Sequence, residues 1–397
     1  MKSKMIVMKF ASVAMALSLI GLAGDGHADD KNVSSRSRKN ALSSSDVSPD
    51  LHMAQLEKAG IRPQSRMPMI TDPAQLPAGV RTMLERKAQD GRTSAAYGSE
   101  GLFPFTTKRA LTSTKNNLPT ASYYRKDTAR GVGKLWMRFG SDWYVCTGSI
   151  IDKGLVVTAA HCVHNFGQGA EGWADEVLFV PMQNGNSKPY GTWKGEEWWV
   201  PAVYYDGTDS CEVESPGVVC ENDLAVVVIK KKPTNRYVGK AVFPALGDSV
   251  GGKYNHQAGN YSYVDISALT EGKTLLAAQI SQFGYPASLD DGTRMIRTDS
   301  LGLQDTFSNV VIGSDQTGGS SGGPWFVNYG RDYVSEESAP ADPQMAVMAV
   351  TSWGYDDGSM IKIQGASRFG TNSIYTDKSN IDSLHEDVCA EYPTHCY

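Results

Sequence analysis

The sequence predicts an all-β fold followed by one short helix near the C-terminus. Forty of the 397 residues are glycine, an above-average share that is typical of a chain with many turns. Short runs of β-forming residues alternate with turn residues through the last two thirds of the chain. Ile381, Leu384 and Val388 lie at helical spacing and predict the C-terminal helix. With 41% hydrophobic and 20% charged residues, the composition is that of an ordinary globular protein.

The predicted strands begin at about residue 134. They cover residues 134–139, 143–151, 155–158, 177–180, 224–229, 279–283, 324–327 and 345–352. The chain before them opens with a run rich in Ser, Asp and Asn (residues 32–50) and has few alternating apolar segments. Apart from a short helix that residues 76–87 favour, we expect this part to be mostly loop.

Charge divides the chain into a basic and an acidic part. Residues 29–134 carry 18 Lys and Arg against 10 Asp and Glu, whereas residues 135–397 carry 17 against 32. A basic arm ahead of an acidic domain predicts a prosegment, residues 29–120, that docks by charge and is later removed. The alternative is a flexible linker whose charge is accidental. The folded domain is then expected to cover residues 121–397.

Two pairs of basic residues are candidate processing sites within or just after the predicted prosegment. They are Lys108-Arg109 and Arg125-Lys126, and exposed loop segments of this kind are the usual sites of proteolytic cleavage. We therefore expect the mature chain to begin between Thr107 and Arg130.

The N-terminus has the pattern of an export signal. Three lysines among the first nine residues precede an apolar stretch, residues 10–22, and small residues follow with a cleavage site after Ala28 or Ala23. Thirteen residues are too few to span a bilayer as a helix. The sequence thus predicts a signal peptide, residues 1–28, membrane contact only during export, and a secreted protein that is extracellular or, in a Gram-negative host, periplasmic.

Cysteine usage agrees with an oxidising compartment. None of the six cysteines forms a C-x-x-C pair, which argues against a zinc ribbon or a redox site. An even number in an exported chain favours disulfides. Proximity in the sequence suggests the pairs Cys146–Cys162, Cys211–Cys220 and Cys389–Cys396.

Charge and hydropathy exclude two function classes. The net charge of −5 argues against a general nucleic-acid binder. Because the only long apolar run lies at the N-terminus, a polytopic membrane protein is excluded. We expect a monomer.

Three short segments carry residues of nucleophilic catalysis. They contain His161 (residues 156–162), Asp223 (residues 222–225) and Ser321 (residues 317–324). Each also has a plainer interpretation: a satisfied buried histidine, a turn-capping aspartate and a flexible Gly/Ser loop.

Together the three residues supply the parts of one reaction, in the chain order His, Asp, Ser. The hydroxyl of Ser321 is a weak nucleophile that needs a base, and the imidazole of His161 can take its proton. Asp223 would orient the imidazole. Glycines around Ser321 let the N–H groups of Gly319 and Ser321 converge on an oxyanion.

These segments resemble those of the trypsin/chymotrypsin-like serine peptidases. The T-A-A-H-C motif ending at Cys162 and the G-x-S-G-G-P motif around Ser321 are highly specific, and the N-D-L-A motif supports them. The resemblance covers about residues 130–397. It implies two packed six-stranded antiparallel β-barrels, formed by residues 134–250 and 251–375, with the triad in the cleft between them.

The resemblance also implies roles for other residues. It supports the disulfide between Cys146 and Cys162, because family members commonly bridge the cysteine after the histidine to one on the preceding strand. Ser352, Trp353 and Gly354 resemble the strand that pairs with the substrate backbone beside the specificity pocket.

The chain departs from the animal members of this family at Ser320. Those members carry an aspartate there, which pairs with a freed N-terminal amine, and no matching Ile-Val-Gly-Gly-like start precedes Trp136. We therefore do not expect activation through that ion pair. The T-G-G-x-S-G motif and residues 282–286 look more like the bacterial branch that includes glutamyl endopeptidases.

Asp315 stands six residues before Ser321, at the position that forms the pocket floor in trypsin-like members. A carboxylate there would pair with a substrate Arg or Lys. Glutamyl endopeptidases place a His just before the Trp-Gly pair, where this chain has Thr351 and Ser352. Preference for an acidic residue, or a solvated Asp315 without a role, remains the alternative.

We therefore expect an exported serine endopeptidase, made as a zymogen, that cleaves protein or peptide substrates through an acyl-enzyme and prefers Arg or Lys at P1. A glutamyl endopeptidase is the alternative, and a catalytically silent homologue that only binds proteins is less favoured. Neither a cofactor nor a metal site is expected. His164 follows His161 by three residues but no third ligand accompanies them, and the acidic cluster at residues 206–209 lacks the spacing of a calcium loop.

Overall fold

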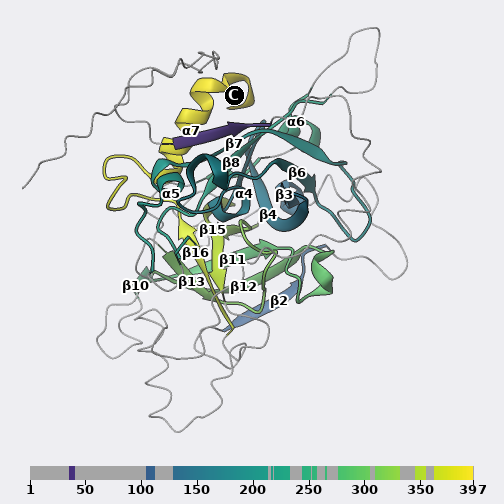
Figure 1. Ribbon diagram of the computed structural model, residues 1–397. Helices are drawn as coiled ribbons and strands as arrows, with labels where there is room; N and C mark the ends of the chain where they lie inside the picture. The colour runs from purple at the N-terminus through teal and green to yellow at the C-terminus, as the bar shows by residue number, and fades with distance from the viewer. Residues whose placement is uncertain are drawn as a thin grey trace, which may run out of the picture. The chain divides into compact units, whose positions relative to one another are not determined.

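The computed structural model consists mainly of two β-sheets. The described residues are 35–40, 104–111, 128–212, 216–217, 219–232, 244–251, 253–256, 264–265, 276–304, 309–330, 345–354 and 362–396. The predicted signal peptide and the helix expected at residues 76–87 lie outside them. Strands dominate the described chain (Figure 1).

The first sheet closes into a six-stranded barrel. Its strands are β3 (Val132–Phe139), β4 (Asp142–Asp152), β5 (Leu155–Thr158), β6 (Glu176–Pro181), β7 (Trp193–Pro201) and β8 (Ala225–Ile229). All pairings are antiparallel in the order β7-β6-β3-β4-β5-β8, and the pairing of β7 with β8 closes the ring. A short strand, β1 (Ser35–Lys39), adds to β7.

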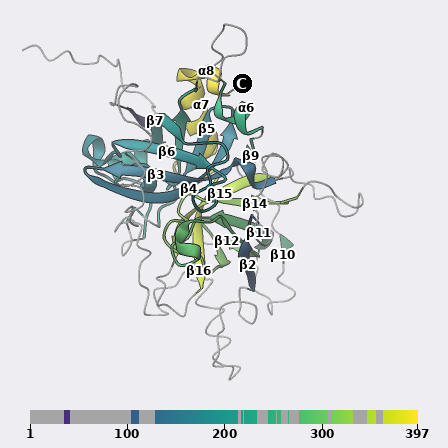
Figure 2. The same ribbon diagram turned by 90° about the vertical axis from the view of Figure 1, so that its right-hand side faces the viewer.

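The second sheet repeats this arrangement. Its ring consists of β11 (Leu276–Gly284), β12 (Ile296–Gln304), β13 (Asn309–Gly313), β14 (Pro324–Val327), β15 (Ala346–Gly354) and β16 (Ile363–Arg368). The order is β11-β14-β15-β16-β13-β12, and β11 also pairs with β12. Three more strands border it: β2 (Phe105–Arg109), β9 (Asn255–His256) and β10 (Val264–Asp265). The two-barrel prediction is confirmed, and Figure 2 shows the strands from a second side.

Helices are few and short. They are α4 (Ala160–Val163), α5 (Ala202–Asp206), α6 (Leu246–Val250), α7 (Asn380–Glu391) and α8 (Pro393–Cys396), with 3-10 turns η3 (Thr128–Gly131), η4 (Gly169–Gly172) and η6 (Asp290–Gly292). The predicted C-terminal helix is confirmed as α7, whose Ser379 hydroxyl caps the Asp382 N–H at 3.0 Å. Within the described residues, no helix is long and apolar enough to cross a membrane.

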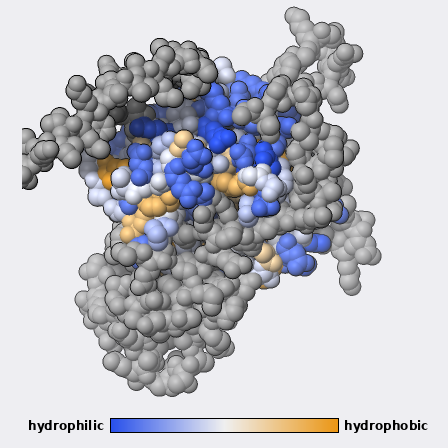
Figure 3. All heavy atoms as spheres, in the orientation of Figure 1, coloured by the Kyte–Doolittle hydropathy of each residue, from blue (hydrophilic) through white to orange (hydrophobic). Residues whose placement is uncertain are grey.

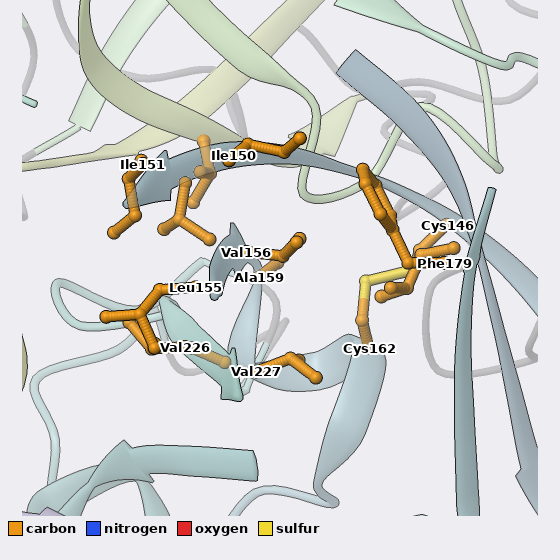
Figure 4. Close-up of a cluster of buried hydrophobic side chains, with 14 of the residues drawn as sticks. Cys146, Ile150, Ile151, Leu155, Val156, Ala159, Cys162, Phe179, Val226 and Val227 are labelled. Atoms are coloured by element: carbon orange, nitrogen blue, oxygen red, sulfur yellow. A yellow bond between two sulfur atoms is a disulfide. The ribbon is translucent and has the colours of Figure 1, made fainter. Parts of the chain in front are cut away.

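The first barrel has an apolar interior. Ile150, Val156, Phe179 and Val227 are fully buried, and Figure 4 shows them around a common core. Burying a side chain of this size stabilises the fold by about 1.5–3 kcal/mol. All of β8 is buried, since one face lines the barrel and α7 contacts the strand from outside. This two-sided burial explains its unbroken run of apolar residues.

Three disulfides connect neighbouring segments, and they are the three predicted pairs. Cys146–Cys162 joins β4 to α4 at the edge of the core in Figure 4. The others are Cys211–Cys220 and Cys389–Cys396, and the described residues include no free cysteine.

The described residues visible in Figure 3 are mostly hydrophilic. On the face shown in Figure 3, apolar residues form only small patches between polar ones. Among the described large hydrophobic side chains, Ile374 alone is exposed.

Two pieces of the segment expected to be loop are strands. Ser35–Lys39 pairs with β7, and Phe105–Arg109 pairs with β12. Neither piece alternates strongly between apolar and polar residues, so their strand conformation comes from pairing with a sheet edge rather than from a local pattern.

Candidate active site

His161 and Asp223 are in direct contact. His161 lies in α4, directly after the fully buried β5, and Asp223 directly precedes β8, the strand that pairs with β5. The Nδ1 of His161 lies 2.7 Å from Asp223 Oδ2, and the His161 backbone N–H donates to Oδ1 at 2.9 Å. Both residues are buried. Because a carboxylate only accepts, the Nδ1 atom carries the proton, and Nε2 is the nitrogen that can act as a base.

A third donor to Asp223 comes from the second barrel. The hydroxyl of Ser352, on β15, donates to Asp223 Oδ2 at 2.5 Å. Three donors therefore satisfy this fully buried carboxylate and hold it in one orientation. The resemblance implies that the backbone of this strand pairs with substrate, and the Ser352 side chain faces the aspartate.

A second buried carboxylate supports the residue before Asp223. Asp209 accepts hydrogen bonds from the backbone N–H and the side-chain amide of Asn222, at 2.8 and 2.7 Å. Asn372 and Asn380 donate to the Asn222 side-chain oxygen from the other side. Burial is the largest influence on Asp209, and it raises the pKa of this carboxyl to about 7.

Ser321 lies in a tight loop that the first barrel holds in place. Thr147, on β4, donates its backbone N–H to the Ser321 carbonyl and its hydroxyl to the Gly319 carbonyl, both at 2.8 Å. On the other side, Gly322 N–H donates to the Thr351 carbonyl at 2.7 Å. Adjacent residues of β15 thus contact the Ser321 loop and the Asp223 carboxylate.

Two glycines in this loop have conformations that side chains rarely adopt. Gly319 has a φ of 97° and Gly322 a φ of 75°. A Cβ on Gly319 would lie 2.5 Å from the Tyr285 carbonyl oxygen. Among the described residues, none accepts a hydrogen bond from the N–H of Gly319 or of Ser321. Both groups therefore remain able to bind a substrate oxygen.

An uncharged network lies behind the loop. The hydroxyl of Ser320 donates to the Thr317 carbonyl at 2.7 Å. The side-chain amide of Gln364, on β16, donates to Ser320 Oγ at 3.1 Å and to the Gln316 carbonyl at 2.8 Å. Gln282 also contacts Gln364. Amides and hydroxyls therefore surround the position where animal family members carry an aspartate.

Asp315 is half-buried at the start of the same loop. Its Oδ1 accepts a hydrogen bond from the Thr107 hydroxyl, on β2, at 2.5 Å. No Lys or Arg of the described chain forms an ion pair with it. Trp353 and Gly354 are buried on β15, which pairs with β16 at Gln364.

A pocket of about 160 Å³ opens beside His161. Phe166 and Tyr204, whose ring centroids are 5.2 Å apart, and His164 are among its lining residues. The Nε2 of His164 is occupied by the Gly169 carbonyl at 2.7 Å, so its role here is to hold the loop after α4.

One cluster of the described residues contains side chains of the kinds that bind metals, but its two cysteine sulfurs form a disulfide. The side chains of Cys146, His161 and Cys162 lie within 4.8 Å of one another. Because Cys146 and Cys162 form a disulfide, they offer no thiolate to a metal.

The family described as Trypsin matches residues 132–372, which is more than half of the chain. The chain belongs to the trypsin family. The matched region includes both barrels and the residues His161, Asp223 and Ser321.

Individual relatives of this trypsin-family chain are distant. An extracellular metalloprotease of Bacillus subtilis is 25% identical over 48% of this chain and 48% of its own length. A glutamyl endopeptidase of Bacillus licheniformis is 24% identical over 46% of this chain and 45% of its own. The chain thus spans about half the length of the curated relatives it matches. Among solved structures, the protease Anisep from Arthrobacter nicotinovorans superimposes with a TM-score of 0.46. The match has 25% sequence identity and covers 66% of this chain and 96% of the Anisep chain.

Several contacts of the site have no local signal in the sequence. The bond from Ser352 to Asp223 and the bond from Thr107 to Asp315 join residues 129 and 208 positions apart. Asn222, by contrast, adjoins a predicted site residue, and its place beside Asp223 could have suggested a supporting role.

Proposed function

We propose that this protein is a serine endopeptidase whose catalytic residues are His161, Asp223 and Ser321. The observation that carries the proposal is the buried contact between His161 and Asp223, next to a loop that presents Ser321 between two glycines of positive φ. The trypsin-family match agrees with it.

The geometry suggests how each group would act. His161 Nε2 takes the proton of the Ser321 hydroxyl as the oxygen attacks the substrate carbonyl. Asp223 holds the ring and stabilises the imidazolium that forms. The N–H groups of Gly319 and Ser321 stabilise the oxyanion, after which His161 returns the proton to the leaving amine. Water then hydrolyses the acyl-enzyme by the same route.

The test is replacement of the nucleophile. Ser321→Ala should abolish labelling by a fluorophosphonate probe and lower kcat by about a millionfold. Ser320→Ala is the matched control, because its hydroxyl supports the loop without reacting, and it should lose far less activity. Turnover that survives in Ser321→Ala would refute the assignment. A wild-type protein that neither labels nor cleaves would instead favour the silent protein-binding homologue.

For specificity, we propose that Asp315 attracts Arg or Lys at P1. Its carboxylate accepts a hydrogen bond from a neutral hydroxyl, so a substrate cation could compensate its charge. Asp315→Asn keeps the shape and the acceptor but removes the charge, and should lower kcat/KM for Arg and Lys substrates about a hundredfold. Labelling of Ser321 should not change. The relative named a glutamyl endopeptidase keeps acidic P1 preference as the alternative, and a wild-type enzyme that prefers Glu at P1 would establish it.

Export and maturation are also part of the proposal. The pattern of residues 1–28 and the three disulfides support secretion as a precursor. Cell fractionation together with N-terminal sequencing would test both steps. Protein that stays in the cytoplasm with an intact N-terminus would contradict them.

A further inference from the structure

Strand β2 is built into the second barrel. It pairs with β12 in antiparallel register over Ile296–Ser300, with Thr107 opposite Thr298. The contact extends beyond the strand, because the Ser300 hydroxyl donates to the Pro104 carbonyl at 3.1 Å and the Ala110 N–H donates to the Met295 carbonyl at 2.9 Å. The edge of β12 is thereby covered.

The basic residues of β2 have acidic partners on the barrel. Lys108 Nζ lies 2.9 Å from Asp299 Oδ2. The Arg109 guanidinium forms a bidentate pair with the Asp290 carboxylate, at 2.6 and 2.5 Å. Each pair is partly exposed and contributes at most modestly to stability. Both basic side chains therefore have acidic partners on the barrel. These ion pairs are an alternative explanation for the Lys108-Arg109 pair, which the sequence alone suggests as a processing site.

Thr107 is the residue of β2 that reaches the active-site loop. Its hydroxyl donates to Asp315 Oδ1 at 2.5 Å and lies 3.1 Å from the Thr298 hydroxyl. Thr298 in turn accepts a hydrogen bond from the Gln316 side-chain amide at 3.1 Å. Asp315 therefore bonds to β2 directly, and Gln316 bonds to Thr298 on β12, which contacts Thr107.

The same chain of hydrogen bonds continues to the residue next to the nucleophile. The Gln316 carbonyl accepts from Gln364 Nε2, which also donates to Ser320 Oγ. Contacts thus run without a break from Thr107 to Ser320. A change at Thr107 acts on Asp315 directly and on the Ser321 loop through Gln316.

We propose that β2 belongs to the active enzyme and that Thr107 is a positioning residue for the loop that runs from Asp315 to Ser321. This inference rests on the proposed peptidase function. It differs from the boundary suggested by charge alone, since a cut after Arg109 would remove both Thr107 and its strand. Any segment that is removed during maturation then ends before Pro104.

Three variants test the role of the Thr107 hydroxyl. Thr107→Val removes the hydroxyl but keeps the shape, Thr107→Ser restores it, and Thr106→Val is the matched control on an exposed position of the same strand. Loss of a hydrogen bond to a carboxylate should lower kcat/KM in Thr107→Val about tenfold. Thr107→Ser should recover to within about twofold of wild type, and Thr106→Val should match wild type.

Two outcomes would overturn the inference and leave the peptidase assignment intact. One is Thr107→Val with wild-type kcat/KM. The other is Thr107→Ser with the same loss as Thr107→Val, because shape and not the hydroxyl would then be responsible.

A second measurement does not depend on activity. In the Ser321→Ala background, Thr107→Val should speed amide hydrogen exchange in residues 315–321, and Thr106→Val should not. Equal exchange in both variants refutes the positioning role even if the protein proves to be no peptidase. N-terminal sequencing of the purified active protein should find a start at or before Pro104, and a fully active form beginning after Arg109 contradicts the inference.

Discussion

The two sides of the active site are held by different chemistry. On the side of His161, buried carboxylates accept the supporting hydrogen bonds: Asp223 from His161 and Ser352, and Asp209 from Asn222. On the side of Ser321, amides and hydroxyls contact one another, as between Gln364 and Ser320. The first side therefore depends on buried carboxylates. The network behind Ser321 is neutral, and the carboxylate of Asp315 lies at the start of the loop, away from Ser320. The comparison predicts that pH acts on the aspartate side and that shape governs the serine side.

The largest expected effect tests the aspartate side. Asp223→Asn keeps the size of the side chain but replaces one carboxylate oxygen by a donor, which cannot accept from both His161 and Ser352. We expect kcat to fall about ten-thousandfold through the wrong imidazole tautomer. Single-turnover kinetics with an ester substrate measures this loss. If kcat of Asp223→Asn falls by less than about tenfold, the carboxylate does not orient His161.

Shape on the serine side is tested by Gly319→Ala. The added Cβ meets the Tyr285 carbonyl oxygen and would displace one oxyanion donor, so we expect kcat to fall about a hundredfold to a thousandfold. Gly140→Ala is the matched control, because Gly140 also has a positive φ, 60°, but no atom lies within 4 Å of its Cβ position. If both variants lose activity equally, backbone strain and not the close contact is responsible.

A charge can be introduced into the neutral network behind Ser321 by Gln364→Glu. Burial raises the pKa of a carboxyl placed at this site. The ratio of variant to wild-type activity should therefore be highest at low pH, where this carboxyl is protonated, and should fall as pH rises. We expect about tenfold lower kcat/KM than wild type at pH 8. The pH profile of the ratio of variant to wild-type activity gives the result. A flat ratio would show that the network does not constrain the loop.

The smallest effect concerns the stability of the aspartate side. The Asp209 carboxyl has a pKa of about 7 instead of the usual 3.8, because burial disfavours its ionised form. Its contribution to the free energy of unfolding is therefore complete below about pH 4 and is lost as pH rises to about 7. Asp209→Asn does not titrate, so the stability advantage of wild type over this variant should shrink across that interval.

Denaturant unfolding at several pH values measures this difference. Asp206→Asn, at an exposed position on α5, serves as the control for the loss of one carboxyl outside the buried site. A difference between wild type and Asp209→Asn that stays constant with pH would contradict the raised pKa.

Strand prediction succeeded for the fully buried strands β5 and β8 and missed β7, β12, β13 and β16. The apolar runs of β5 and β8 are visible in the sequence because both strands are fully buried. β16 contains Gln364, Gly365 and Ser367 and has no such pattern, yet it lies between β13 and β15. Its conformation follows from two neighbouring strands that the local sequence does not show.

The sequence by itself predicted the candidate catalytic residues, their chain order and the three disulfide pairs. Each of these depends on short motifs, or on cysteines separated by at most 16 positions, so local reading suffices. Only the tertiary structure decided which neighbours hold the reactive groups. Ser352 reaches Asp223 across the two barrels, and Thr107 reaches Asp315 by adding a strand to a sheet edge. These contacts depend on the register between strands that are far apart in the sequence. Local residue type and spacing do not predict that register.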